Sequence, residues 1–150
     1  MKKLVYVAGP FSPSNGKEME KNTEFAERVG RYAQSLGYAP VVPHSSILRQ
    51  VYGDDSIKQD RLEGTLSTLA VMMAVMDTED SELWVIKNED GKMSEGTYEE
   101  WSIWMENRGS RSMRLLEASL WEKEMEKFYL DQLIEATINS KEDPWNLERY

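Results

Sequence analysis

The chain opens with a short apolar run that ends abruptly in a Gly-Pro pair. The run spans Lys3 to Val7, is rich in valine, and leads into a loop that begins Ala8-Gly9-Pro10-Phe11. A continuous apolar run of this length, closed by turn residues, predicts a strand that is buried on both faces. Such strands occur in α/β proteins, which bind small ligands outside the carboxyl ends of their strands. The loop at Gly9 is therefore the first place to expect a site.

Strand and helix patterns alternate along the rest of the chain. Apolar residues at helical spacing predict a helix from Glu18 to about Leu36, with Gly37 as its C-terminal cap. The alternation predicts an α/β fold, a parallel sheet flanked by helices. The other predicted elements are a strand at 38–42, a helix from residue 60, a strand at 83–87, a helix at 97–107 and a long C-terminal helix at 121–138.

In the helix from residue 60, five apolar side chains fall on one face, and we expect this face to pack on the sheet. We also expect a cluster of methionines from this helix in the core. The face consists of Leu62, Leu66, Leu69, Met73 and Met76, and the cluster consists of Met72, Met73 and Met76. Residues 113–117 fit either an edge strand or the first turn of a helix.

Composition limits what this chain can be. A length of 150 residues fits one domain over 1–150, with a C-terminal helical extension at about 119–138. The absence of cysteine excludes disulfides and thiolate metal sites, and the single histidine, His44, excludes a histidine-rich one. We find no signal peptide or membrane span and expect a cytoplasmic protein. A net charge of −9 disfavours nucleic acid polymers as partners, but a local cluster of N–H groups can still hold a small anion.

A second loop, far from the first, enters a helix with carboxylates at its start. It runs from Ser94 through Gly96 and Thr97 to Glu100. Thr97 and Glu100 have the spacing of a capping box, in which Thr97 is the N-cap and Glu100 bonds back to it. The same turn also aims unpaired N–H groups at any anion placed there, and Ser94 adds a hydroxyl donor. The structural and the functional interpretation both stay open.

Other candidate side chains lie near the ends of the predicted strands. Asp80 directly precedes the third strand and is placed to point across the end of the sheet, whereas Asp77 lies a little earlier; acidic residues in such connections are ordinarily solvated. Tyr6 is expected in the core, where its hydroxyl needs a polar partner such as a carboxylate. His44 follows the second strand, and we do not predict a catalytic role for it. No metal site is predicted.

In combination, these residues resemble the nucleoside 2-deoxyribosyltransferases and their nucleotide N-hydrolase relatives. The resemblance covers about the first 108 residues, and it rests on the order and spacing of several short motifs. It implies a Rossmann-like, flavodoxin-type parallel sheet and cleavage of an N-glycosidic bond. The motifs are Tyr6-x-Ala8-Gly9-Pro10-Phe11, Asn22, the segment Gly37 to Pro43, an aspartate before the third strand, and Ser94-x-Gly96-Thr97-x-x-Glu100.

The resemblance also implies roles for particular residues. Glu100 matches the nucleophile that attacks the anomeric carbon, and Tyr6 matches the tyrosine that orients this carboxylate. Asp80 most nearly matches the aspartate that handles the base and its proton, with Asp77 as the alternative. As in retaining glycosidases, a carboxylate traps an oxocarbenium-like centre while an acid assists the leaving group, and no cofactor is implied. The loop that lines the sugar and base pocket is matched by Gly9, Pro10 and Phe11.

One departure from the family pattern concerns the substrate. Transferases that use free nucleosides usually carry an aspartate where this chain has Ser94, and that aspartate holds a sugar hydroxyl. A serine can donate a hydrogen bond to a 5′-phosphate, which an aspartate would repel. We therefore expect a nucleoside or, preferably, a nucleoside 5′-monophosphate, held by Ser94, Gly96 and Thr97 and cleaved by an N-hydrolase or a deoxyribosyltransferase.

Two other classes of function stay open. The same fold can sequester a nucleotide without turnover, although the pairing of Glu100 with Tyr6 favours chemistry. Alternatively, the acidic surface and the helix at 121–138 serve contacts with other proteins. This helix also leads us to expect a homo-oligomer, although it can equally pack on its own domain.

Overall fold

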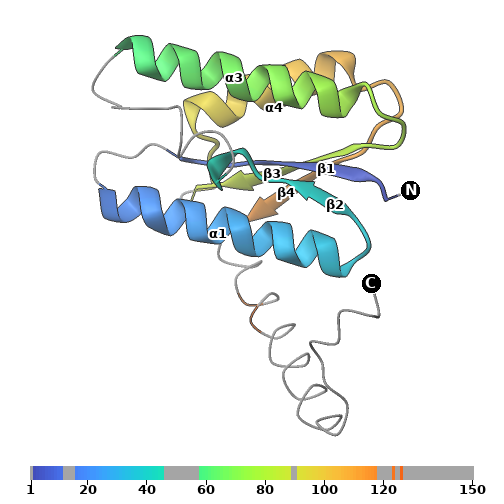
Figure 1. Ribbon diagram of the computed structural model, residues 1–150, viewed down its shortest axis with the longest axis horizontal. Coiled ribbons are helices and arrows are strands. Elements are labelled where there is room, and N and C mark those ends of the chain that lie inside the picture. The colour runs from blue at the N-terminus through green and yellow to red at the C-terminus, as the bar shows by residue number, and fades with distance from the viewer. Residues whose placement is uncertain are drawn as a thin grey trace, which may run out of the picture.

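The computed structural model describes residues 2–11, 16–45, 58–88 and 91–117, and beyond them Lys123 and Glu126. These residues form an α/β fold in which one parallel sheet separates two layers of helices (Figure 1). The strands lie in the order β2-β1-β3-β4. Their bounds are Leu4–Ala8 for β1, Ala39–Val41 for β2, Glu82–Lys87 for β3 and Met113–Glu117 for β4.

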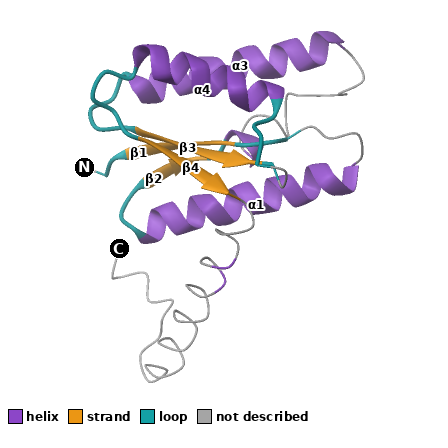
Figure 2. Ribbon diagram, turned by 180° about the vertical axis from the view of Figure 1, so that it is seen from behind, coloured by secondary structure: helices purple, strands orange, loops and turns teal. Residues whose placement is uncertain are grey.

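The helices cover both faces of the sheet. α1 (Gly16–Ser35) lies on one face, and α3 (Lys58–Met76) and α4 (Glu95–Asn107) lie on the other, as Figure 2 shows from behind. Gly37 has a φ of 97°, a left-handed conformation that lets the chain turn from α1 into β2 as predicted. The predicted Rossmann-like parallel sheet is therefore confirmed.

β1 divides the hydrophobic core into two layers because its side chains alternate between the two faces. Val5 and Val7 belong to the cluster under α1, whereas Tyr6 and Ala8 belong to the cluster under α3 and α4. All four side chains are fully buried. The valine-rich run is thus buried on both faces, as its composition predicts.

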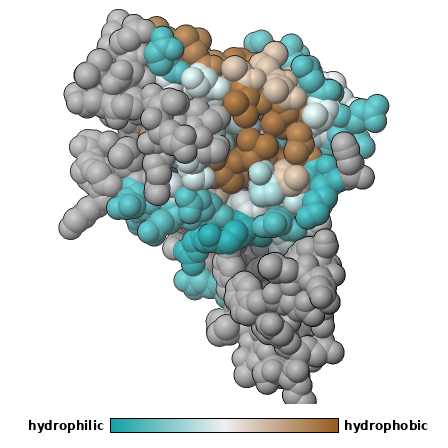
Figure 3. All heavy atoms as spheres, in the orientation of Figure 1, coloured by the Kyte–Doolittle hydropathy of each residue, from teal (hydrophilic) through white to brown (hydrophobic). Residues whose placement is uncertain are grey.

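α3 buries only part of the face that its periodicity predicts: Leu69 and Met76 pack against the sheet as expected, but the rest of that face is exposed. Leu62, Leu66 and Met73 are 50%, 52% and 43% exposed, whereas Met72 and Met76 are buried against the sheet. The second half of α3 is apolar on every side, so helical periodicity cannot identify the packed face, and contact with the sheet decides it. Figure 3 shows hydrophobic residues gathered on this side of the molecule, over α3 and between α3 and β2.

The last described strand settles one of the sequence alternatives. Residues 113–117 form β4, an edge strand that pairs in parallel with β3. The helix predicted at 121–138 lies outside the described residues, except for Lys123 and Glu126, which are helical. None of the helices within the described ranges is both long enough and apolar enough to cross a membrane.

Candidate active site

The carboxyl ends of β1, β2 and β3 meet at one edge of the sheet because these strands are parallel. The loop at Gly9 leaves β1 at this edge, His44 follows β2, and Ser94 follows β3 at the start of α4. The connection from β1 to β2 runs through α1 on one face of the sheet, and the connection from β2 to β3 runs through α3 on the other face (Figure 1). β2 and β3 therefore lie on opposite sides of β1. Ligands of α/β sheets bind where the winding reverses in this way. The two loops that the sequence singles out thus reach the same edge, on neighbouring strands.

The loop after β1 is held closely by its neighbours. A Cβ atom on Gly9 would lie only 3.1 Å from the Cβ of Ile86, so a larger residue there would displace the loop. His44 Nε2 lies 3.1 Å from the carbonyl oxygen of Gly9 and 3.0 Å from that of Pro10. The Phe11 ring packs edge-on against the His44 ring, with 5.7 Å between centroids. These contacts fix the course of the loop at the end of the sheet.

The start of α4 differs from the predicted capping box. Ser94 is the N-cap: its backbone is extended, and its hydroxyl accepts a hydrogen bond from the Thr97 N–H at 3.3 Å. Thr97 lies inside the first turn and is buried, with its hydroxyl 2.7 Å from that of Ser94. The helix begins earlier than predicted, so Glu100 lies deeper in it. The capping interpretation of Thr97 and Glu100 is therefore wrong.

Gly96 is the residue at this helix start that the fold does not explain. A Cβ atom at Gly96 would meet no other atom within 4 Å. A glycine inside a helix is less stable than alanine by about 0.5–1 kcal/mol. The open space beside Gly96 adjoins the first-turn N–H groups and the positive end of the helix dipole, which together favour an anion.

Glu100 is a buried carboxyl group between α4, α3 and the sheet. It is 9% exposed, and its Oε2 atom is buried without a hydrogen-bond partner. Burial raises the pKa of Glu100 from 4.5 to about 7, a hydrogen bond with Tyr6 opposes this shift, and the charge of Glu99 adds to it. An unpartnered buried carboxyl oxygen is costly for a fold and calls for an explanation.

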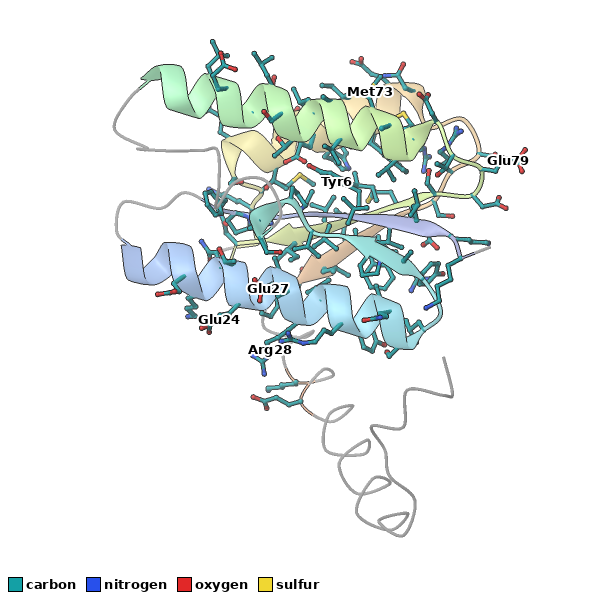
Figure 4. The ribbon with its side chains drawn as sticks, in the orientation of Figure 1. Tyr6, Glu24, Glu27, Arg28, Met73 and Glu79 are labelled. Carbon is teal, nitrogen blue, oxygen red and sulfur yellow. The ribbon has the colours of Figure 1, made fainter. Side chains whose placement is uncertain are left out.

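Tyr6 connects Glu100 to α3. Its fully buried hydroxyl (Figure 4) donates to the Thr68 carbonyl oxygen at 3.2 Å and also hydrogen-bonds to Glu100. Burial, followed by the nearby Glu100 charge, raises the pKa of Tyr6 well above its ordinary value. A phenol has one proton, so while Tyr6 donates to Thr68 the bond to Glu100 needs the carboxyl proton. When Glu100 is ionised, Tyr6 can donate to it instead.

Asp80 and Asp77 do not join this group. Both are exposed and lie between α3 and β3, at the edge where the strands begin. The six residues of β3 separate that edge from the ligand-binding edge, and Figure 4 shows the neighbouring Glu79 at the end where β1 starts. Residues that precede a strand of a parallel sheet lie at its amino edge. The expectation that Asp80 points across the ligand-binding end of the sheet is not met.

His44 is the site residue to which the sequence analysis assigns no role. It is 1% exposed, and burial lowers its pKa to about 4, so the ring is neutral at physiological pH. The sequence feature that points to His44 is its position directly after a strand and a proline, at the carboxyl edge of the sheet. Within the described ranges, histidine, aspartate and glutamate side chains do not gather in groups of three or more that could hold a metal ion.

Comparison with known proteins assigns the chain to a family. No curated protein and no solved structure matches the chain. One family model matches, over residues 3–112, which include β1 to β3, the three helices and the residues of the candidate site. Because this match covers more than half of the chain, the protein belongs to the family described as a domain of unknown function (DUF7768).

Proposed function

We propose that this protein cleaves the N-glycosidic bond of a nucleoside 5′-monophosphate, or of a nucleoside, with Glu100 as the nucleophile. The observation that carries the proposal is the buried carboxyl group of Glu100, with one unpartnered oxygen beside the Tyr6 hydroxyl. Buried carboxyl groups that only support a fold are normally paired. The motifs shared with nucleoside 2-deoxyribosyltransferases, and the flavodoxin-type winding that they imply, favour the same reaction.

In the proposed reaction, ionised Glu100 attacks the anomeric carbon while the bond from that carbon to the base breaks. The bonding electrons leave with the base, which takes up a proton from water. Water then attacks the glycosyl ester and restores the carboxylate, or a second base does so in a transferase. Tyr6 orients the carboxylate by donating a hydrogen bond to it. Asp80 has no part in this mechanism because it lies at the opposite edge of the sheet.

The phosphate of the substrate is placed at the start of α4. The N–H groups of the first turn and the helix dipole attract it, and the space beside Gly96 admits it. When Thr97 donates its hydroxyl proton to Ser94, the Ser94 proton is free to point to a phosphate oxygen. Glu100 follows Ser94 by about 9 Å along the helix axis, which leaves the sugar between the phosphate and the carboxyl group.

Nucleotide binding without turnover is the second candidate function. The loop at Gly9 and the start of α4 would serve it equally well, but it would leave the buried carboxyl group of Glu100 without a purpose. For either function we propose a homo-oligomer, to which the exposed apolar side chains Leu66 and Met73 of α3 offer a surface.

A substrate panel tests the proposal. Nucleosides and nucleoside 5′-monophosphates are incubated with the protein, and released base is separated by chromatography. We expect release from monophosphates, its loss in Glu100→Gln, and unchanged release in Glu106→Gln, a matched change at an exposed position of the same helix. Ser94→Ala is expected to lower kcat/KM for monophosphates but not for nucleosides. Tight binding without release would favour sequestration, and neither binding nor release would refute both functions.

A further inference from the structure

The two ring nitrogens of His44 have different surroundings. Nε2 lies within hydrogen-bond distance of the carbonyl oxygens of Gly9 and Pro10. Carbonyl oxygens only accept hydrogen bonds, so Nε2 carries the hydrogen and serves both of them. Because the ring is neutral, Nδ1 has no hydrogen and is an acceptor.

The Nδ1 atom is buried and has no hydrogen-bond partner. Leaving a buried acceptor unpaired destabilises a fold, and such atoms in native proteins call for an explanation. Holding the loop after β1 does not supply one, because the contacts with the Gly9 and Pro10 carbonyl oxygens use only Nε2. The contact with Phe11 is made by the ring as an aromatic group and does not use Nδ1 as an acceptor.

We propose that His44 is a base-recognition residue, in which Nδ1 accepts a hydrogen bond from an amino group on the nucleobase of the bound nucleotide. This inference rests on the proposed function, because it takes the ligand to be a nucleotide. It adds a preference for bases that carry an amino group over bases that carry a carbonyl oxygen at the same position, since an acceptor repels a second acceptor.

The strand order supports this placement of the base. Ser94 and His44 follow strands on opposite sides of β1. A phosphate at Ser94 and a sugar at Glu100 direct the other end of the nucleotide across the loop after β1, toward β2. Phe11, half-buried on this path, offers an aromatic ring beside His44, and flat bases pack well on such rings.

Two variants separate recognition of the base from support of the loop. Glutamine places an amide near the Nε2 position, so His44→Gln keeps a donor for the loop carbonyls and removes the acceptor at Nδ1. Asparagine places an amide oxygen near the Nδ1 position, so His44→Asn keeps an acceptor and removes the donor to the loop. The dissociation constants are measured by calorimetry in a Glu100→Gln background, so that no turnover occurs. The probes are matched pairs, adenosine with inosine 5′-monophosphate and cytidine with uridine 5′-monophosphate.

We expect the protein that retains His44 to bind the amino-bearing member of at least one pair about 10-fold more tightly. His44→Gln should lose this preference with an unchanged melting temperature, whereas His44→Asn should keep the preference and melt at a lower temperature. Equal binding within both pairs, or a preference that survives His44→Gln, would overturn the proposal, as would absence of binding by all four probes. If wild type binds with the expected preference but releases no base, base recognition stands and the proposed cleavage fails.

Discussion

Replacing Glu100 by glutamine should stabilise the folded protein at neutral and alkaline pH while it abolishes the proposed chemistry. Glutamine has nearly the same shape as a protonated glutamate and can make the same hydrogen bond to Tyr6. It never acquires a charge, so the cost of ionising a buried side chain disappears. The expected gain therefore depends on pH, unlike the effect of a change in packing.

The size of the gain follows from the pKa of Glu100, which is 4.5 in the unfolded chain and about 7 in the folded protein. Below pH 4.5 both states hold the proton, so the charge costs nothing. As the pH rises from 4.5 to 7, only the folded state holds it, so the free energy of unfolding falls. Above pH 7 the accumulated loss is about 3 kcal/mol. Glu100→Gln should recover this amount, which raises the melting temperature by about 6–12 °C in a chain of this size.

Urea denaturation of both proteins at several pH values between 4.5 and 8.5 measures this difference. The other titrating groups are common to both proteins and cancel in the comparison, so the difference should grow from near zero to its full value. Glu106→Gln, an exposed change on the same helix, is the control and should show no such trend. A difference that stays constant with pH, or a loss of stability at pH 8.5, would show that the carboxyl group of Glu100 is not buried as described.

Three further changes test the site and the fold. Tyr6→Phe removes a hydrogen bond that lowers the pKa of the neighbouring carboxyl group, so the rise of base release with pH should shift to higher pH; an unshifted profile would contradict that contact. Gly30→Ala places a Cβ atom 2.7 Å from Val42 Cγ2 and should cost about 1–3 kcal/mol in thermal denaturation, whereas no loss would mean that α1 lies farther from β2. Met72→Ala should cost about 2–5 kcal/mol and Met73→Ala less than about 1 kcal/mol, and equal losses would contradict the described orientation of α3.

The features that the sequence predicted correctly depend on local chemistry. A valine-rich run favours a buried strand, and glycine takes the left-handed conformation that ends a helix without strain; β1 and Gly37 are both found as predicted. The arrival of the loops at Gly9 and Ser94 at one edge follows from parallel pairing, which the alternation of strands and helices implies. Glu100 lies on the helix predicted for it because the sequence pattern of residues 97–107 is helical.

The features that were missed depend on contacts between distant parts of the chain. The packed face of α3 is only partly predicted because the second half of this helix is apolar all round. Asp80 precedes a strand and therefore lies at the edge opposite the ligand-binding one. The N-cap was placed at Thr97 because its spacing to Glu100 fits a capping box, but the buried position of Glu100 beside Tyr6 excludes that bond. The role of His44 depends on two carbonyl groups far away in the sequence.

The stability that the folded protein loses when the buried Glu100 ionises is itself an argument for function. Ser94 already caps α4, and apolar side chains such as Met72 and Trp104 fill the core beside it. A neutral side chain of similar size at position 100 would fill the same space without the loss of stability at neutral pH. Strongly shifted carboxyl groups of this kind gather at sites where their ionisation is used. If Glu100→Gln proves more stable than wild type and inactive, stability and chemistry make opposing demands on one side chain, and a purely structural role for Glu100 is excluded.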